Sequence, residues 1–296
     1  MESEIGFGSY HPAVCFSLFA CAIVLGMFAS HPAFLAANVG FAALYYLLLR
    51  GLRALRLLGG LFVLFCVITA ANPLFNTLGD TVLFTYFGRP YTLEALMWGA
   101  DTAALLVGML LWFSCYNLIM TSDKLTALFG RAAPSLSLVF TMVLRLVPTY
   151  HRKIDQIAAA RAGIGKSPSA GSLASRVESG AGVLSALTSC ALEGAVATAD
   201  SMRARGYGLG RRTSWSRHRF TVRDKVLAGA VALLAAAAAA AIATGAAAAS
   251  FSPAVSLPPA TPAFACGLSA YAALLAVPSA ITVRERILWR ISLSNI

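Results

Sequence analysis

Long apolar runs separated by short polar or basic loops make up both ends of this 296-residue chain. A helix of about 20 apolar residues crosses the hydrocarbon core of a bilayer. Six runs approach that length and predict transmembrane helices at 13–29, 33–49, 57–71, 93–120, 226–249 and 262–281. Only Ser30-His31-Pro32 separates the first two runs, so we expect a tight helical hairpin in which Pro32 begins the second helix. We expect the third helix to end at Asn72-Pro73.

The segment between the third and fourth runs has a different pattern. Residues 81–87 are strand-like, and Gly88-Arg89-Pro90 is typical of a turn. A small β-hairpin is therefore predicted between these two spans.

The middle of the chain, 121–225, is neither continuously apolar nor a linker. Apolar residues at steps of three and four mark one face of a first helix: Leu136, Val139, Phe140, Val143, Leu144 and Val147. Arg145 interrupts this run and Pro148 is expected to end it, so the helix is too short to span and should lie at the membrane surface.

Two further helices are predicted in this middle segment, at about 150–162 and 173–205, separated by a break at 163–168. The last helix has one apolar stripe and a group of small residues that allow close helix–helix contact: Gly180, Ala181, Gly182, Ser185 and Ala186. The fold class is therefore an all-α polytopic membrane protein. Its parts are four spans in 1–120, a module of crossing amphipathic helices in 121–225, and two spans in 226–296.

Composition and charge support this division. Hydrophobic residues make up 58% of the chain and charged residues 12%, against about 25% charged residues in soluble domains. Of the 23 Lys and Arg residues, 16 lie in 121–225, and 22 lie on one side of the membrane in the predicted topology. This places 121–225 and both termini in the cytoplasm of a cell-membrane protein. Topology and anionic membrane lipid account for the basic excess, so nucleic acid is not an expected partner.

Residues with catalytic or metal-binding chemistry are scattered. The six cysteines lie mostly in apolar runs without a Cys-x-x-Cys pair, and the four histidines do not cluster, so neither a metal site nor a catalytic site is predicted. The spans hold two acids, Glu94 and Asp101, and Asp101 is expected to make a polar contact with Trp98 or Thr102. Residues 160–167 match a relaxed phosphate loop, but a helix precedes them and a proline follows, so nucleotide binding is not expected.

The end of the last middle helix combines cations with a glycine. Arg203 and Arg205 lie in its final turn, where the helix dipole favours positive charge, and Gly206 suits a left-handed cap. A rigid helix end of this kind can hold Arg205 toward an acidic groove on a partner, because the guanidinium donates to a carboxylate through two N–H groups.

Five phrases in order along the chain carry a family resemblance: Ser9-Tyr10-His11-Pro12, Asn72 to Asn76, Thr92 to Ala95, Leu144 to Pro148, and Ala199 to Gly206. On these phrases the chain resembles the transmembrane T component of energy-coupling factor (ECF) transporters, a branch of the ABC transporters that imports micronutrients. The resemblance implies a scaffold rather than an enzyme. It also implies two crossing coupling helices that each end in an Ala-Arg-Gly motif, whose arginine docks into one ATPase subunit.

The two motifs match this pattern unequally. The second carries over as Ala204, Arg205 and Gly206, with Arg203 as a supporting residue. The first begins as Ala160-Arg161, but Ala162 follows and Gly163 comes one place late. The resemblance therefore implies Arg161 as the first docking arginine and Arg205 as the second.

The partners that the resemblance implies are two ATPase subunits and a small substrate-binding S component for a vitamin or a metal ion. ATP would bind to the ATPase subunits, so no cofactor is expected on this chain. Residues on the middle helices are expected to contact the S component: Leu136, Phe140, Val143, Leu184 and Leu187. A membrane-embedded enzyme and a stand-alone transporter with a basic cytoplasmic module remain the alternatives.

Overall fold

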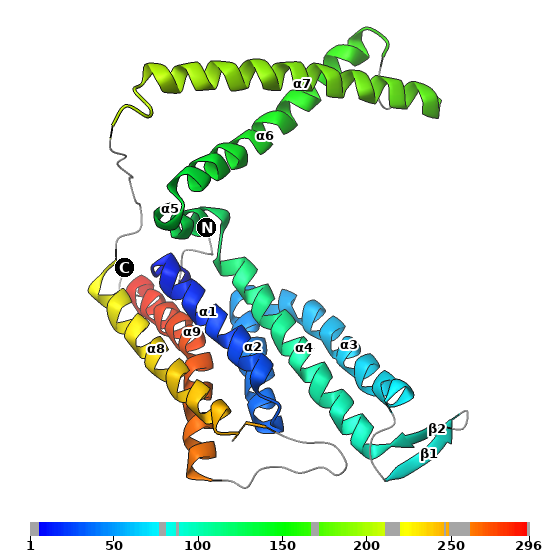
Figure 1. Ribbon diagram of the computed structural model, residues 1–296, viewed down its shortest axis with the longest axis vertical. Helices are drawn as coiled ribbons and strands as arrows, with labels where there is room; N and C mark the ends of the chain where they lie inside the picture. The colour runs from blue at the N-terminus through cyan, green and yellow to red at the C-terminus, as the bar shows by residue number, and fades with distance from the viewer. Residues whose placement is uncertain are drawn as a thin grey trace. The chain divides into compact units, whose positions relative to one another are not determined.

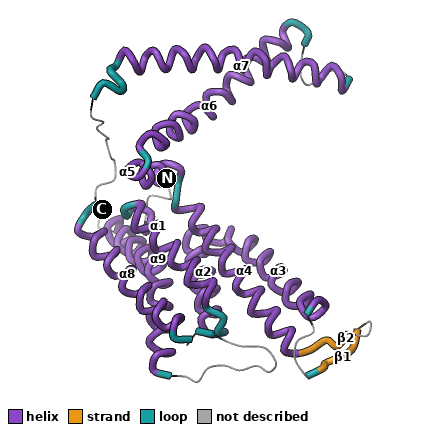
Figure 2. The backbone as a smooth tube through the Cα atoms, in the orientation of Figure 1, coloured by secondary structure: helices purple, strands orange, loops and turns teal. Residues whose placement is uncertain are grey.

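The protein is described by a computed structural model that covers residues 6–76, 81–86, 89–166, 172–210, 220–245, 247–248 and 261–294. Two compact units are formed, Met1–Leu125 with His218–Ile296 and Thr126–Arg217. Helices dominate, with one two-stranded hairpin (Figures 1 and 2). The elements are η2 (Gly6–Ser9), α1 (Pro12–Phe28), α2 (Pro32–Arg50), η3 (Gly51–Arg53), α3 (Ala54–Phe75), β1 (Val82–Tyr86), β2 (Arg89–Thr92), α4 (Leu93–Ile119), α5 (Ser122–Ala132), α6 (Pro134–Gly163), α7 (Leu173–Ala204), α8 (Val222–Ala243) and α9 (Pro262–Ser294).

The first unit contains the helices that correspond to the six predicted apolar runs: α1, α2, α3, α4, α8 and α9. By length and composition, five stretches are able to span a membrane: Pro32–Phe75, Leu93–Ile119, Leu173–Ala204, Val222–Ala243 and Pro262–Trp289. The first of these includes both α2 and α3, and α1 is a shorter apolar helix. The chain is therefore an all-α, multi-pass membrane protein, as predicted. The stretch Leu173–Ala204 is α7, which the sequence pattern assigned to the middle segment.

Local capping explains where α8 differs from its predicted boundaries. Helix α8 begins four residues before the expected 226 because Thr221 and Asp224 form a reciprocal capping box. It ends at Ala243 rather than 249, and Gly245 then adopts a left-handed conformation with φ +79°. Helix α9 continues past the expected 281 to Ser294.

The third span passes through the proline that was expected to end it. Helix α3 includes Asn72 and Pro73 and ends at Phe75. A proline removes one intrahelical hydrogen bond, here the bond to the Thr69 carbonyl, and leaves the others intact. That carbonyl oxygen lies 3.0 Å from the position of a Cβ on Gly99 of α4, and the Cβ of Asn72 lies 2.6 Å from it. Gly99 therefore lets α4 approach α3 closely at this point.

The predicted hairpin between the third and fourth spans is confirmed. Strand β1 pairs antiparallel with β2, with Tyr86 opposite Arg89. Arg89 and Pro90 belong to β2 rather than to the turn, and Phe87 and Gly88 lie outside the described residues. Thr92 then caps α4 by accepting a hydrogen bond from the Ala95 backbone N–H at 3.4 Å.

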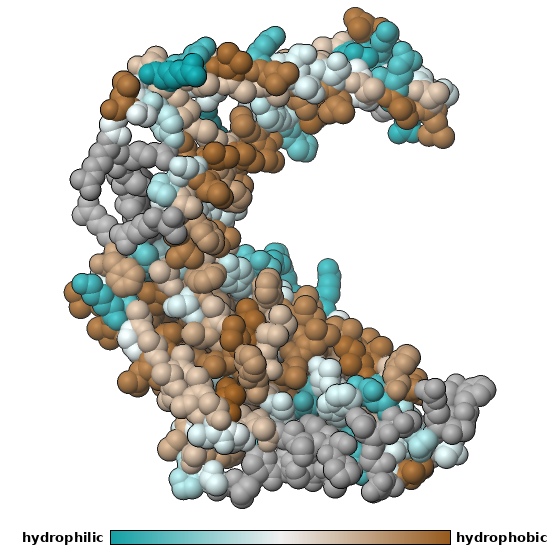
Figure 3. Space-filling model, in the orientation of Figure 1, coloured by the Kyte–Doolittle hydropathy of each residue, from teal (hydrophilic) through white to brown (hydrophobic). Residues whose placement is uncertain are grey.

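Aromatic packing around one buried amide holds α1, α2 and α4 together. The Trp112 indole N–H donates to Asn38 Oδ1 at 2.7 Å, and the Trp112 ring lies beside those of Phe19 and Tyr45. Gly26 and Gly108 leave room for Asn38, because a Cβ on either glycine would lie 2.8 Å from its Nδ2 atom. In contrast, many large apolar side chains on the outside of this unit are exposed, as a lipid-facing surface requires (Figure 3).

The alanine-rich helix α8 packs against α9 through small residues. A Cβ on Gly267 of α9 would lie 2.2 Å from the Cβ of Ala241, so the two helix backbones are close together there.

The second unit contains α6 and α7, which pack against each other. The prediction of two separate helices around Pro148 is wrong, since α6 is continuous from Pro134 to Gly163. The Thr149 hydroxyl donates to the Arg145 carbonyl at 3.1 Å, and Arg152 Nε donates to the Pro148 carbonyl at 3.3 Å. Both side chains thus bond to backbone carbonyls one turn earlier, within the helix that continues through Pro148.

Candidate functional site

The C-terminal end of α7 has a complete cap. The Tyr207 N–H donates to the Met202 carbonyl at 3.0 Å, and the Gly206 N–H donates to the Arg203 carbonyl at 2.9 Å. Gly206 has φ +77°, the left-handed conformation that was predicted for it. These two bonds define a Schellman motif in which Arg205 is the C-cap residue. The backbone that carries Arg205 is therefore held in one conformation.

The side chains at this end are available to a partner. Ala204, Arg203 and Arg205 are all exposed. Among the described residues, neither arginine forms an ion pair or a side-chain hydrogen bond. An unpaired guanidinium on a capped helix end can bind a carboxylate without giving up an existing contact.

Helix α6 ends in the same backbone motif with different side chains. The Lys166 N–H donates to the Arg161 carbonyl at 2.9 Å, and the Gly165 N–H donates to the Ala162 carbonyl at 3.0 Å. Gly165 also has φ +77°. When the two caps are aligned, Ile164 occupies the position of Arg205, and it is 72% exposed. Arg161 lies three residues earlier, at the position of Met202.

The Arg161 side chain is engaged with the neighbouring helix. A Cβ on Gly182 of α7 would overlap the guanidinium group of Arg161, so a larger residue at this position would displace that group. Arg161 is half-buried, and its Nε atom is buried without a hydrogen-bond partner among the described residues. Arg161 therefore lies at the helix crossing, whereas Arg205 lies at a free helix end.

The crossing uses the small-residue face of α7. Ser179 and Val183 are the buried residues of this helix, and they lie beside Gly182. Gly180 contributes no close contact, because a Cβ there would meet nothing within 4 Å. Gly182 and Arg205 are 23 residues apart, which is about 35 Å along a helix. The two arginines predicted to dock are therefore far apart on one unit.

The residues predicted to contact an S component differ in exposure. Leu136, Phe140 and Val143 on α6 are exposed, as is Leu184 on α7 at 63%. Leu187 is half-buried. The four exposed side chains form apolar surface that no described residue covers.

Sequence reasoning missed a polar cluster that joins the segment before α1, the first turn of α8 and the C-terminal part of α9. Arg223 bonds Glu285 at 2.6 Å and donates to the Tyr10 hydroxyl at 2.7 Å, and its guanidinium carbon lies 4.1 Å from the Tyr10 ring centre. Glu285 also accepts from the Gly6 N–H at 2.6 Å. Tyr10 belongs to a phrase that carried the family resemblance, and its partners are more than 200 residues away in sequence.

Two further bonds tie the N-terminal segment to the residues that flank the second unit. Lys124 Nζ donates to the Gly8 carbonyl at 2.7 Å, and the His11 N–H donates to Asp224 at 3.0 Å. A lone lysine after an apolar span and the spacing Thr221-x-x-Asp224 were visible in the sequence, but their partners were not. The N-terminal segment thus bonds to residues of the first unit that come just before and just after the second unit in the sequence.

Histidine–proline pairs open the first two spans. His11 Nδ1 accepts from the Ala13 N–H at 3.1 Å, and His31 Nδ1 accepts from the Ala33 N–H at 3.2 Å. Burial lowers the pKa of His31, which favours the neutral ring that can accept this bond. The prediction that Pro32 begins the second helix is confirmed.

The two acids in the spans behave differently. Glu94 accepts from the Thr81 hydroxyl at 2.6 Å. Asp101 is buried, and its Oδ1 atom has no hydrogen-bond partner among the described residues. The expected contact of Asp101 with Trp98 or Thr102 is not formed, since the Thr102 hydroxyl donates instead to the Trp98 carbonyl at 2.9 Å. Among the described residues, no three His, Cys, Asp or Glu side chains form a metal-binding group.

Comparisons with known proteins point in one direction. No protein-family model matches the chain. The energy-coupling factor transporter transmembrane protein EcfT of Staphylococcus aureus is 27% identical over 173 residues. The matched region covers 55% of this chain and spans 65% of the length of that relative. Together with the several long apolar helices, this similarity supports an EcfT-like membrane protein.

Proposed function

We propose that this chain is the transmembrane scaffold of an ECF transporter, which couples ATP hydrolysis by two cytoplasmic ATPase subunits to movement of a substrate-binding S component. The observation that carries the proposal is the exposed Arg205, which pairs with no described residue, on the capped end of the 32-residue helix α7. The similarity to a transporter transmembrane protein supports it. In this proposal the chain is not an enzyme, and ATP acts on the partner subunits.

Charge on both sides of α7 supports a cytoplasmic position for this helix, although it is apolar enough to span. Residues 121–166 contain seven Lys and Arg residues, and 203–225 contain eight. A spanning α7 would place one of these groups on the outer side, against the bias of basic residues toward the cytoplasm. We therefore keep 121–225 and both termini in the cytoplasm.

This topology has its own test. Ile164 and Leu209 flank α7 and are 72% and 89% exposed. Cysteines placed at these two positions in a cysteine-free chain should react from the same side of sealed membrane vesicles with a thiol reagent that does not cross membranes. Reaction from opposite sides would mean that α7 crosses the bilayer.

The arrangement of α6 and α7 suits the transmission of force. Helices of 30 and 32 residues are about 45 Å and 48 Å long. A displacement imposed at Arg205 acts about 35 Å from the crossing at Gly182. The hydrogen bonds that Lys124 donates to Gly8 and that the His11 N–H donates to Asp224 would transmit this displacement to the spans.

The first docking contact is less direct than the second. For Arg161 to bind an ATPase subunit, its guanidinium must leave the space above Gly182. Arg161 remains our candidate for that contact, with Ala160 as its neighbour, and the separation of about 35 Å from Arg205 suits two separate subunits. The exposed apolar residues Leu136, Phe140, Val143 and Leu184 are the surface for the S component. The cargo, a vitamin or a metal ion, is held by that component.

The proposal is tested by affinity purification of the full chain from its native membranes, with identification of the co-purified proteins by mass spectrometry. Two ATPase subunits and a small membrane protein should accompany the wild-type chain. Arg205→Ala should lose the ATPases and keep the membrane protein. Arg176→Ala, which removes an exposed arginine from the other end of α7, is the matched control and should lose neither. Absence of ATPases from the wild-type sample would overturn the proposal.

A further inference from the structure

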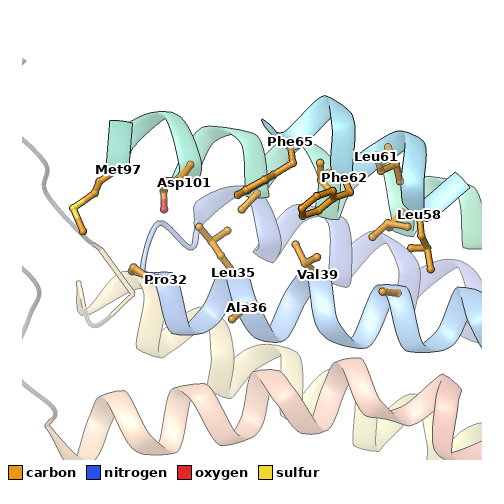
Figure 4. A pocket seen from close by; sticks show the side chains of 15 residues that line it. Pro32, Leu35, Ala36, Val39, Leu58, Leu61, Phe62, Phe65, Met97 and Asp101 are labelled. Atoms are coloured by element: carbon orange, nitrogen blue, oxygen red, sulfur yellow. The ribbon is translucent and has the colours of Figure 1, made fainter. Parts of the chain in front are cut away.

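An apolar groove lies between α2, α3 and α4 in the first unit (Figure 4). Its volume is about 590 Å³, which falls within the range of about 300–1,000 Å³ typical of small-molecule sites. Leu35 and Val39 of α2 face Phe62 and Phe65 of α3 across it. Such a groove on a lipid-facing surface is filled by some apolar group, because nothing polar could be solvated there.

One polar group lies at one end of this groove. Of the fifteen described residues that line it, Asp101 alone has a polar side chain. Asp101 is 8% exposed, and its carboxyl group is directed into the groove beside Met97 and Pro32 (Figure 4). Its Oδ1 atom has no hydrogen-bond partner among the described residues. A buried carboxyl without a partner is costly, and a ligand that donates to it would remove that cost.

The position of Asp101 along the spans indicates what kind of ligand fits. Pro32, the first residue of α2, lines the same end of the groove, so this end lies at the membrane boundary on the side of the β-hairpin. The wall on α2 runs from Pro32 to Ala43, a rise of about 16 Å. That is close to half of a hydrocarbon core about 30 Å thick. The groove thus has the depth of one leaflet and its polar group at the headgroup end.

We propose that this groove binds one acyl chain of a phospholipid from the hairpin-side leaflet, and that the primary ammonium of its headgroup donates to Asp101. An ethanolamine headgroup fits the carboxyl group by charge and supplies N–H donors. A choline headgroup carries the same charge but has no N–H group, and a glycerol headgroup leaves the lipid with a net negative charge. This lipid site does not depend on the proposed transport function.

The headgroup dependence is tested first on the wild-type protein. The full chain, purified in detergent and depleted of lipid, is titrated with phosphatidylethanolamine, phosphatidylcholine and phosphatidylglycerol that carry identical acyl chains, and bound lipid is counted by native mass spectrometry. Phosphatidylethanolamine should bind about tenfold more tightly than the other two, as a charge-assisted hydrogen bond implies. Equal binding of the three lipids would overturn the proposal. This test does not depend on the folding of any variant.

Variants then locate the site. Asp101→Asn keeps the shape of the side chain and removes its charge, so the preference for phosphatidylethanolamine should fall to less than about twofold. Ala104→Phe places a ring in the groove and should abolish high-affinity binding of one lipid. Leu110→Phe, on the same helix and outside the groove wall, is the matched control and should bind as the wild type does. Unchanged binding in Ala104→Phe would mean that the lipid is held elsewhere or that another molecule fills the groove.

Discussion

Helices α6 and α7 end in the same backbone motif, yet the two ends expose different chemistry. Both have a glycine with φ +77° after the C-cap residue, and both satisfy their last carbonyls through the same pair of bonds. At the C-cap position α7 carries Arg205, whereas α6 carries Ile164. The arginine of the α6 end lies one turn earlier and packs on Gly182.

This difference separates two properties of the motif, ending a helix and binding a partner. Glycine in the left-handed conformation ends a helix whatever side chain precedes it. Binding a partner additionally requires an exposed side chain that no neighbour engages. Among the described residues Arg205 meets this requirement, whereas Arg161 is half-buried against Gly182. Similar caps therefore do not imply similar binding sites. Substitutions at Arg205, at Gly182, at the two capping glycines and at Arg203 test this comparison.

The largest effect is expected from charge reversal at the α7 end. Arg205→Glu should weaken binding of the co-purifying ATPase pair by roughly thirtyfold or more, because truncating or reversing a paired interfacial charge costs about 2 kcal/mol or more. The measurement is a titration of the ATPase pair onto the full chain in nanodiscs. Ile164→Glu at the equivalent position of α6 is the control. An equal loss in both variants would show that net charge, rather than the individual arginine, governs docking.

A side chain at the crossing should have the next largest effect. Gly182→Leu places carbon atoms where the Arg161 guanidinium lies, so we expect a loss of about 1–3 kcal/mol from overpacking. The thermal unfolding midpoint of the full chain measures this loss of stability. Gly180→Leu, two residues away and with nothing within 4 Å of its Cβ, gains the same helix propensity without this overlap, so it should unfold at a higher temperature than Gly182→Leu. If both variants unfold at the same temperature, α6 and α7 do not cross at Gly182.

Substitution of the capping glycines should cost the same at both ends. Gly206→Ala and Gly165→Ala each force an alanine into φ +77°, at a cost of about 1 kcal/mol. Thermal unfolding should show equal losses for the two variants. Only Gly206→Ala should also weaken ATPase binding, since it disturbs the backbone that holds Arg205. A binding loss in Gly165→Ala of the same size would make the two ends functionally equivalent.

The smallest effect is expected at the neighbouring arginine. Arg203→Ala removes an exposed charge that acts only as a supporting residue in the proposal, so ATPase binding should change by less than about threefold, as for a charge at the rim of an interface. The same titration measures it. A loss as large as that of Arg205→Glu would assign Arg203 an equal share of the docking contact.

Local patterns predicted much of this fold. The six apolar runs, the hairpin before α4 and the left-handed Gly206 all follow from residues close together in sequence. The predictions that failed concern prolines. Pro73 and Pro148 were expected to end helices, but each removes a single hydrogen bond, and the remaining bonds continue through both. A proline therefore marks a weakened position, and its neighbours decide whether the helix stops.

The candidate site was predicted only in part. Arg205 was identified as the last residue before a capping glycine, and the structure places it at an exposed helix end. The position of Arg161 was not foreseeable, because the residue beneath it, Gly182, is on another helix. The same holds for Tyr10, whose partner Arg223 comes from the last third of the chain and also bonds Glu285.

The sequence by itself determined which segments of this protein are helical, which are apolar enough for a membrane, and where α7 ends. These properties depend on hydropathy, hydrogen bonding and backbone preference within a few residues. Only the tertiary structure decided which side chains remain free: Arg205 is exposed, Arg161 is engaged at a crossing, and Asp101 faces an apolar groove. Whether a side chain can bind a partner depends on its burial and on its contacts with segments distant in sequence. A local sequence pattern does not contain this information.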